Sequence, residues 1–290
     1  MSGSDAIKGF SYQCAYTLYR LLDLLSGEDG GRTSLVAEGT GPDVEDLTLR
    51  FPDGTEEVIQ IKKRETRQGA YGQWGWSEIS PIVRSLYQLI ELDRDITRFR
   101  FVATGSAQSR IVSVQKACQK LREGQPSGDA DERAVEAVMA ATGATKSAAR
   151  RFMRRLWLDI PFDDESSLRA RVQNRLIKAA SVPAEVVDRV YNDLTARILE
   201  KGKPLEPEAR RISREDLLSW LESPADPRLK SSLGPRVVQR VKALRGSLTG
   251  AEVQNLDHRG LEIEQRVETV EAGGKAVGLR EGSEPDGGEA

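Results

Sequence analysis

The side chains of this sequence that are best suited to chemistry lie close together in its first quarter. Four carboxylates come first, and a glutamine and a lysine follow two positions apart: Glu38, Asp43, Glu45, Asp46, Gln60 and Lys62. Mg²⁺ prefers oxygen ligands and is commonly held by one or two carboxylates together with waters and phosphate oxygens. A metal can activate water and polarise a phosphate, while an ammonium group orients the water or stabilises developing charge. These residue types therefore suit metal-dependent hydrolysis of a phosphodiester.

A predicted β-hairpin brings these side chains together. Two strands, over residues 44–51 and 58–63, flank a tight turn at residues 53–54, where an Asp-Gly pair is a strong turn signal. In the second strand Gln60 and Lys62 alternate with isoleucines, so the two polar side chains share one face. Counting back across the turn sets the acidic end of the first strand opposite this pair. Several carboxylates gathered there need a counter-charge, which a divalent cation supplies.

The elements around the hairpin predict an α/β fold with a central mixed sheet flanked by helices. Helical periodicity and strand-like alternation follow one another in the order helix, strand, hairpin, helix, strand, helix. The helices are expected over residues 5–25, 77–90 and 109–121, and the strands outside the hairpin over residues 34–38 and 98–106.

A change in composition near residue 125 predicts a domain boundary. The polar, glycine-containing stretch at residues 123–132 separates an α/β domain, residues 1–125, from a second domain, residues 126–245, whose apolar pattern is nearly all helical. Residues 246–290 are polar and aperiodic, so we expect a disordered tail.

The composition argues against several other chemistries. The chain has one histidine, His258, and two cysteines, so histidine-based triads, multi-histidine metal sites and cysteine-rich zinc sites are not expected. Cys14 and Cys118 lie in amphipathic helical patterns, and we expect both to be buried free thiols in a reducing cytosol. The net charge of -2 means that any contact with nucleic acid must come from a local basic surface.

The sequence also predicts a cytoplasmic protein that makes no contact with membrane. It has no long uncharged apolar run of the kind that spans a bilayer. The stretch "MSGSDAIKGF" has neither the basic nor the apolar region of a signal peptide.

Several short motifs resemble a known nuclease family. "PDVED" at residues 42–46, a hairpin turn and "IQIKK" at residues 59–63 resemble the PD-(D/E)XK nuclease motif, in the variant where glutamine replaces the acid before the lysine. "GFSYQ" at residues 9–13, followed by "AEG", "PDVE" and "IQIK", resembles one branch in particular. That branch is the double-stranded DNA endonuclease domain of bacterial antiphage effectors, including those of CD-NTase (CBASS) systems. The resemblance covers about the first 120 residues.

The resemblance implies a restriction-endonuclease-like fold and a role for each matching residue. It implies that Asp43, Gln60 and Lys62 are catalytic, that Asp43 and Gln60 bind metal with Glu38, and that Gln13 is an accessory residue.

The metal-binding role of Asp43 has two alternatives. If the register of the hairpin shifts, Glu45 or Asp46 takes this role in place of Asp43. The implied cofactor is Mg²⁺ or Mn²⁺, and the implied substrate is double-stranded DNA in antiphage defence.

Two features have alternatives that the sequence leaves open. Gln60 and Lys62 could instead be polar residues that protect the edge of an exposed hairpin from aggregation. A basic helix could grip DNA phosphates or could present a solvated face over a core stripe. The arginines of that helix are Arg150, Arg151, Arg154 and Arg155.

Other classes of function compete with the nuclease. The chain could be a catalytically silent module that docks DNA or a partner, or an accessory subunit of a defence complex. It contains no Walker-type phosphate-binding motif. We therefore expect an oligomer of the chain itself, or a separate sensor or NTPase subunit, to switch it on.

Overall fold

The structure is a computed structural model, and it describes most of the chain up to residue 246. The described residues are 3–26, 34–37, 46–51, 53–64, 66–67, 70–91, 95–203 and 207–246. The chain divides into a compact unit of residues 1–241 and a second unit of residues 242–290. The fold described below is that of the first unit. Residues 247–290 of the predicted tail lie outside the described residues.

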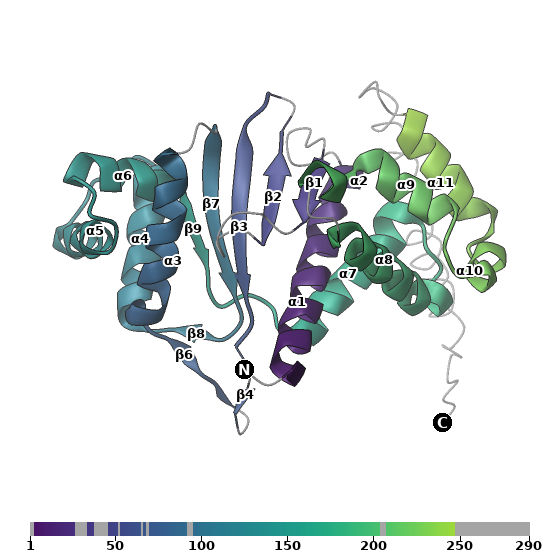
Figure 1. The fold of residues 1–290 in the computed structure, drawn as a ribbon, viewed down its shortest axis with the longest axis horizontal. Coiled ribbons are helices and arrows are strands. Elements are labelled where there is room, and N and C mark those ends of the chain that lie inside the picture. The colour runs from purple at the N-terminus through teal and green to yellow at the C-terminus, as the bar shows by residue number, and fades with distance from the viewer. Residues whose placement is uncertain are drawn as a thin grey trace, which may run out of the picture. The chain divides into compact units, whose positions relative to one another are not determined.

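A six-stranded mixed sheet forms the centre of the first unit (Figure 1). Its strands lie in the order β10, β1, β2, β3, β7, β9. The first four pair antiparallel, whereas β3, β7 and β9 run parallel. Their bounds are β1 (Ser34–Ala37), β2 (Leu47–Arg50), β3 (Glu56–Lys62), β7 (Ile96–Ala103), β9 (Leu156–Asp159) and β10 (Arg211–Ser213). The predicted mixed sheet is confirmed.

The hairpin of β2 and β3 has the predicted turn. Gly54 has a φ of 85°, a left-handed conformation that glycine adopts without steric cost. The Asp53 carboxylate accepts hydrogen bonds from the backbone N–H and the hydroxyl of Thr55, at 2.9 and 2.8 Å. The pairing of Leu47 with Ile59 fixes the register of the two strands.

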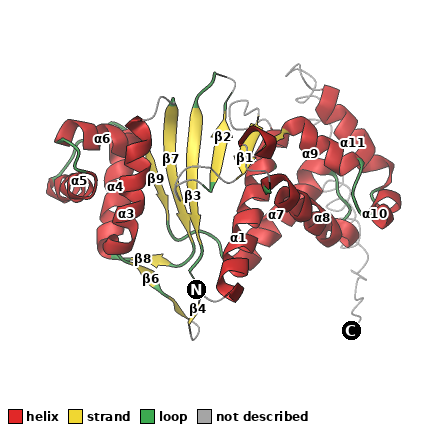
Figure 2. Ribbon diagram, in the orientation of Figure 1, coloured by secondary structure: helices red, strands yellow, loops and turns green. Residues whose placement is uncertain are grey.

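Helices cover both faces of the sheet (Figure 2). On one face α1 packs against β3, and α7 and α8 pack against α1, while α3, α4 and α6 lie on the other face and α5 packs against these three helices. These helices are α1 (Gly3–Leu21), α3 (Trp76–Gln88), α4 (Ser109–Arg122), α5 (Asp129–Thr142), α6 (Lys146–Arg155), α7 (Glu165–Ala180) and α8 (Val187–Gly202). None of the described helices is long and apolar enough to cross a membrane.

The remaining elements are short or lie late in the chain. They are α2 (Asp23–Ser26), α9 (Arg214–Glu222), α10 (Pro227–Ser232), α11 (Gly234–Gly246), the 3₁₀ helices η1 (Leu89–Glu91), η2 (Ala184–Val186) and η3 (Pro207–Arg210), and the strands β4 (Thr66–Arg67), β5 (Ala70–Tyr71), β6 (Gln73–Trp74) and β8 (Ser106–Ala107). β4 pairs with β5, and β6 pairs with β8, in two small sheets.

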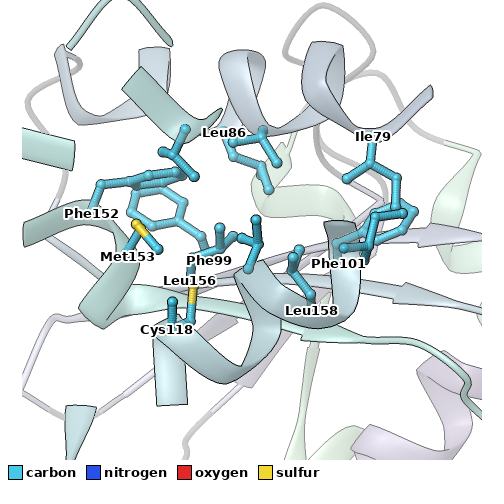
Figure 3. Close-up of a cluster of buried hydrophobic side chains, with 14 of the residues drawn as sticks. Ile79, Leu86, Phe99, Phe101, Cys118, Phe152, Met153, Leu156 and Leu158 are labelled. Atoms are coloured by element: carbon cyan, nitrogen blue, oxygen red, sulfur yellow. The ribbon is translucent and has the colours of Figure 1, made fainter. Parts of the chain in front are cut away.

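The core on the α3 and α4 face is a cluster of buried aromatic and aliphatic side chains (Figure 3). Phe152 of α6 lies with its ring centroid 5.3 Å from that of Phe99 and 5.4 Å from that of Tyr87. Such pairs add about 0.5–1.5 kcal/mol beyond the burial of their area. Cys118 lies in the same cluster as a free thiol, and its burial raises its pKa to about 12. The prediction that both cysteines are buried free thiols is confirmed.

Two strands correct the prediction that residues 126–245 are all helical. β9 directly follows α6 in the chain, and β10 directly precedes α9. β9 and β10 are nevertheless the two edge strands of the central sheet. Strands of four and three residues contain too few alternations to be told from helix by periodicity. Pairing with a distant strand decides the structure instead, because Leu156 pairs with Phe99. The predicted boundary near residue 125 therefore falls inside one compact unit.

A buried ion-pair network fastens α1 to the other face of the sheet. The fully buried carboxylate of Glu57 in β3 accepts a hydrogen bond from Arg100 of β7 at 2.6 Å. It also lies 3.4 Å from a guanidinium nitrogen of Arg20 in α1. Arg20 contacts Asp23 at 2.9 Å, and Arg100 also pairs with Asp159 of β9. Buried charges are tolerated when they are paired in this way.

Substituting Glu57 with alanine should strongly destabilise the fold. The change leaves the buried Arg20 and the largely buried Arg100 without the carboxylate that they share, which costs about 3–5 kcal/mol. Urea denaturation measures this loss. The control is Glu200→Ala, which breaks an exposed pair with Lys203 and should cost less than about 1 kcal/mol. Equal losses in the two variants would contradict the role of Glu57.

Candidate active site

Asp46 is the centre of the site that the hairpin forms. It directly precedes β2, and its backbone N–H donates to the carbonyl oxygen of Ile59 at 3.1 Å. Because Leu47 pairs with Ile59, Asp46 comes opposite Gln60. The prediction that the acidic end of the first strand faces Gln60 and Lys62 is confirmed for this residue.

The carboxylate of Asp46 receives donors from two different elements. Its Oδ2 accepts from Gln60 Nε2 at 2.5 Å and from the backbone N–H of Ile61 at 2.6 Å. Its Oδ1 accepts from Gln13 Nε2 of α1 at 2.8 Å. The Nζ of Lys62 lies 4.0 Å from Oδ2. The first helix and the hairpin, which are separate in sequence, thus meet at one carboxylate.

Burial separates the roles of these side chains. Gln60 is 2% exposed, so its amide needs a hydrogen-bond partner, and Asp46 provides one. Asp46 has 16% of its side chain exposed and Lys62 has 40%. The lysine ammonium group therefore reaches solvent beside a nearly buried carboxylate, where a substrate can meet it.

The protection of an exposed edge does not explain Gln60 and Lys62. β3 lies between β2 and β7 in the middle of the central sheet, so it is not an edge strand. Polar residues that block edge-to-edge pairing would have no purpose at this position. The alternative left open by the sequence is thereby removed.

The donor set at Asp46 fits a divalent cation in part. One carboxylate with amide oxygens, waters and substrate phosphates is a known way to hold Mg²⁺. Both glutamines present their amide nitrogens to Asp46 here, so Gln60 would have to turn its amide oxygen toward a cation. No group of three or more histidine, cysteine, aspartate or glutamate side chains that could hold a metal occurs among the described residues.

The predicted site residues divide into two sets. Gln13, Gln60 and Lys62 meet at Asp46, which the sequence offered as an alternative to Asp43. The other three predicted carboxylates lie outside the described residues, and their roles stay predictions: Glu38, Asp43 and Glu45.

Thr104 holds the end of β3 and was missed by the sequence analysis. Its backbone N–H donates to the carbonyl oxygen of Lys62 at 3.3 Å, and its hydroxyl accepts from the backbone N–H of Arg64 at 2.8 Å. Trp74 also donates to the carbonyl oxygen of Thr104, at 2.7 Å, and is buried in the core. In the sequence Thr104 lies inside the predicted strand, so no signal marked it as a residue that holds the end of β3.

The basic helix is partly engaged within the chain. Arg150 pairs with Glu132, and Arg155 donates to the carbonyl oxygen of Ile96 at 3.1 Å. Arg151 and Arg154 are exposed. The contacts of Arg150 and Arg155 support the fold, and the binding of DNA phosphates by Arg151 and Arg154 stays a prediction.

Comparison with known proteins identifies a shared fold. No family model matches the sequence, and no curated protein matches it. The Cap4 SAVED/CARF-domain-containing receptor of Acinetobacter baumannii aligns over 80% of this chain at 12% identity with a TM-score of 0.53, both alone and with the cyclic trinucleotide 3'3'3'-cAAA. With 2'3'3'-cAAA the same receptor aligns over 74% of the chain, with a TM-score of 0.50.

The likeness covers only part of the receptor. The chain spans about half its length, 46% and 48% in the two structures with the higher score. At this sequence identity the likeness shows the fold alone. The chain therefore shares its fold with part of a SAVED/CARF-domain-containing receptor.

Asp46→Ala should weaken metal binding at least about tenfold, because the change removes the carboxylate on which Gln13 and Gln60 converge. Titration calorimetry with Mn²⁺ measures the affinity. The control is Asp53→Ala, which removes a carboxylate from the turn of the same hairpin. Wild-type affinity in Asp46→Ala, together with a loss in Asp43→Ala, would move the ligand role to Asp43.

Proposed function

We propose that this chain is a metal-dependent nuclease of the PD-(D/E)XK type that hydrolyses phosphodiester bonds of double-stranded DNA in bacterial antiphage defence. One observation carries the proposal. The side chains of Gln13, Gln60 and Lys62 converge on Asp46, although α1 and the hairpin are separated in sequence. These are the positions that the resemblance to the nuclease motif singles out, with Asp46 in the place of the metal-binding aspartate.

The order of elements supports the same proposal. α1, β1, β2, β3, α3 and β7 follow one another, with the site on the hairpin of β2 and β3 and a parallel strand beside it. This arrangement suits the restriction-endonuclease-like fold that the sequence resemblance implies.

Each residue has a chemical role in the proposed reaction. A bound Mg²⁺ or Mn²⁺ would supply an activated water and a polarised phosphate. Asp46 and the amide oxygen of Gln60 would hold it. Lys62, which is partly exposed and 4.0 Å from Asp46, donates a hydrogen bond to the attacking water or to a phosphate oxygen and so stabilises developing charge. Gln13 orients the Asp46 carboxylate from the opposite oxygen.

The likeness to the Cap4 SAVED/CARF-domain-containing receptor favours a second candidate function, the binding of a cyclic trinucleotide, because that receptor is seen with 3'3'3'-cAAA. Calorimetry with 3'3'3'-cAAA separates the two. Binding without any cleavage of DNA would favour the sensor, and cleavage without binding would favour the nuclease.

A catalytically silent module that binds DNA or a partner is the remaining alternative. Among the described residues, the large apolar side chains that are exposed are Ile90 and Val238. The other large apolar side chains of the described helices are therefore wholly or partly buried within the chain. Control by self-assembly or by a separate sensor subunit stays a prediction.

Lys62→Ala should lower the rate of plasmid cleavage in Mg²⁺ or Mn²⁺ at least about 10²-fold, because charge stabilisation of this kind contributes that much. The fold should be intact, since substitutions of exposed residues usually change stability by less than about 0.5 kcal/mol. Agarose gels measure cleavage and thermal melting measures folding. Lys203→Ala, which removes an exposed lysine paired with Glu200 just after the end of α8, is the matched control. A folded Lys62→Ala variant that cuts at the wild-type rate would refute the assignment.

A further inference from the structure

A second polar cluster joins the same two elements that carry the proposed catalytic residues. The carboxylate of Glu165, at the start of α7, accepts a hydrogen bond from Lys63 Nζ at 2.6 Å. Its other oxygen accepts from the hydroxyl of Ser11 in α1. Ser11 lies two residues before Gln13, and Lys63 directly follows Lys62. One carboxylate from the second half of the chain therefore bridges the helix and the strand end that meet at Asp46.

The segment before α7 is anchored at the same end of the sheet. The backbone N–H of Phe162 donates to the carbonyl oxygen of Ala103 at 2.9 Å, and Ala103 pairs with Lys62 in the sheet. The hydroxyl of Tyr12 donates to the carbonyl oxygen of Asp163 at 3.0 Å. These two hydrogen bonds fix the position of the backbone just before Glu165.

The helix that begins with Glu165 is also fixed along α1. α7 packs beside α1 (Figure 1). Arg175 of α7 pairs with Asp23 at 2.5 Å and donates to the carbonyl oxygen of Tyr19 at 2.9 Å. The contacts of Glu165 with Ser11 and Lys63 add a direct link from α7 and α1 to the end of β3, where the site lies.

The charge state of Glu165 suits this bridge. Burial alone would raise the pKa of Glu165. The hydrogen bonds from Lys63 and Ser11 lower it by more than burial raises it, so the pKa of Glu165 lies below its usual value. The carboxylate is therefore ionised at neutral pH. It also neutralises the Lys63 ammonium group, which pairs with it at 2.6 Å.

We propose that Glu165 is a positioning residue of the site, which holds Lys63 and Ser11 so that Gln13 reaches Asp46 and Lys62 faces the substrate. This inference rests on the proposed nuclease function. Stability is a weak reason for the pair, because Glu165 is about one-third exposed and partly exposed ion pairs contribute little. Small displacements of catalytic groups, in contrast, lower reaction rates steeply.

The test compares three variants of the full chain in plasmid cleavage with Mg²⁺. Glu165→Gln keeps the shape of the side chain and removes its charge. The double variant Lys63→Glu with Glu165→Lys reverses the pair. The control is Asp188→Asn, which removes the charge of an exposed carboxylate on α8. Asp188 pairs with Arg169, which lies in α7 as Glu165 does.

Glu165→Gln should lower kcat about tenfold to 10²-fold, with little change in KM for DNA or in Tm. The reversed pair should restore most of the rate, and Asp188→Asn should match the wild type. A second readout does not depend on cleavage. The Ile61 amide, which donates to Asp46, should exchange its hydrogen about fivefold faster in Glu165→Gln, because its acceptor is less well held.

The outcomes separate this inference from the proposed function. If the wild-type protein does not cut DNA but the Ile61 amide exchanges faster in Glu165→Gln, the proposed nuclease function is refuted and the positioning role of Glu165 is retained. Wild-type kcat in Glu165→Gln, or unchanged Ile61 exchange where the wild type does not cut, would overturn the positioning role.

Discussion

The carboxylate of Glu57, which is shut off from water, is the constraint on which the arrangement of the site depends. Its negative charge is stable in the interior because Arg100 and Arg20 reach it from β7 and α1. Without Glu57, Arg20 would keep Asp23 and Arg100 would keep Asp159, but both would lose the carboxylate that they share, and a buried charge that loses a partner is costly. α1 is therefore held against β3 in one position. Gln13, about two turns before Arg20 in the same helix, is placed by this contact beside the end of the hairpin.

From that constraint the site follows by short steps. The register of β2 with β3 sets Asp46 opposite Gln60, and burial of the Gln60 amide requires the hydrogen bond between them. Thr104 fixes the backbone at Lys62, where the strand leaves the sheet. The result is one carboxylate with two amides and one ammonium group, in which only Lys62 reaches solvent to a large extent. That is an arrangement suited to acting on an anionic substrate.

The sequence predicts the parts of this account that depend on local patterns. The Asp53-Gly54 turn and the alternation in residues 58–63 were enough to predict the hairpin and to bring Asp46 near Gln60. Contacts between distant segments could not be predicted in the same way. Nothing in the sequence links Glu165 with Ser11, and the four residues of β9 become a strand because β7 lies beside them. Tertiary pairing decided both cases.

The central claim is that Asp46 and Gln60 form a metal site at the end of the hairpin. Anomalous diffraction from crystals of the chain soaked in Mn²⁺ tests it most directly. The account predicts a single strong peak within about 2.0–2.3 Å of an Asp46 carboxylate oxygen, with the Gln60 amide turned so that its oxygen faces the ion. Absence of a peak beside Asp46 in crystals that bind Mn²⁺ elsewhere would contradict the account.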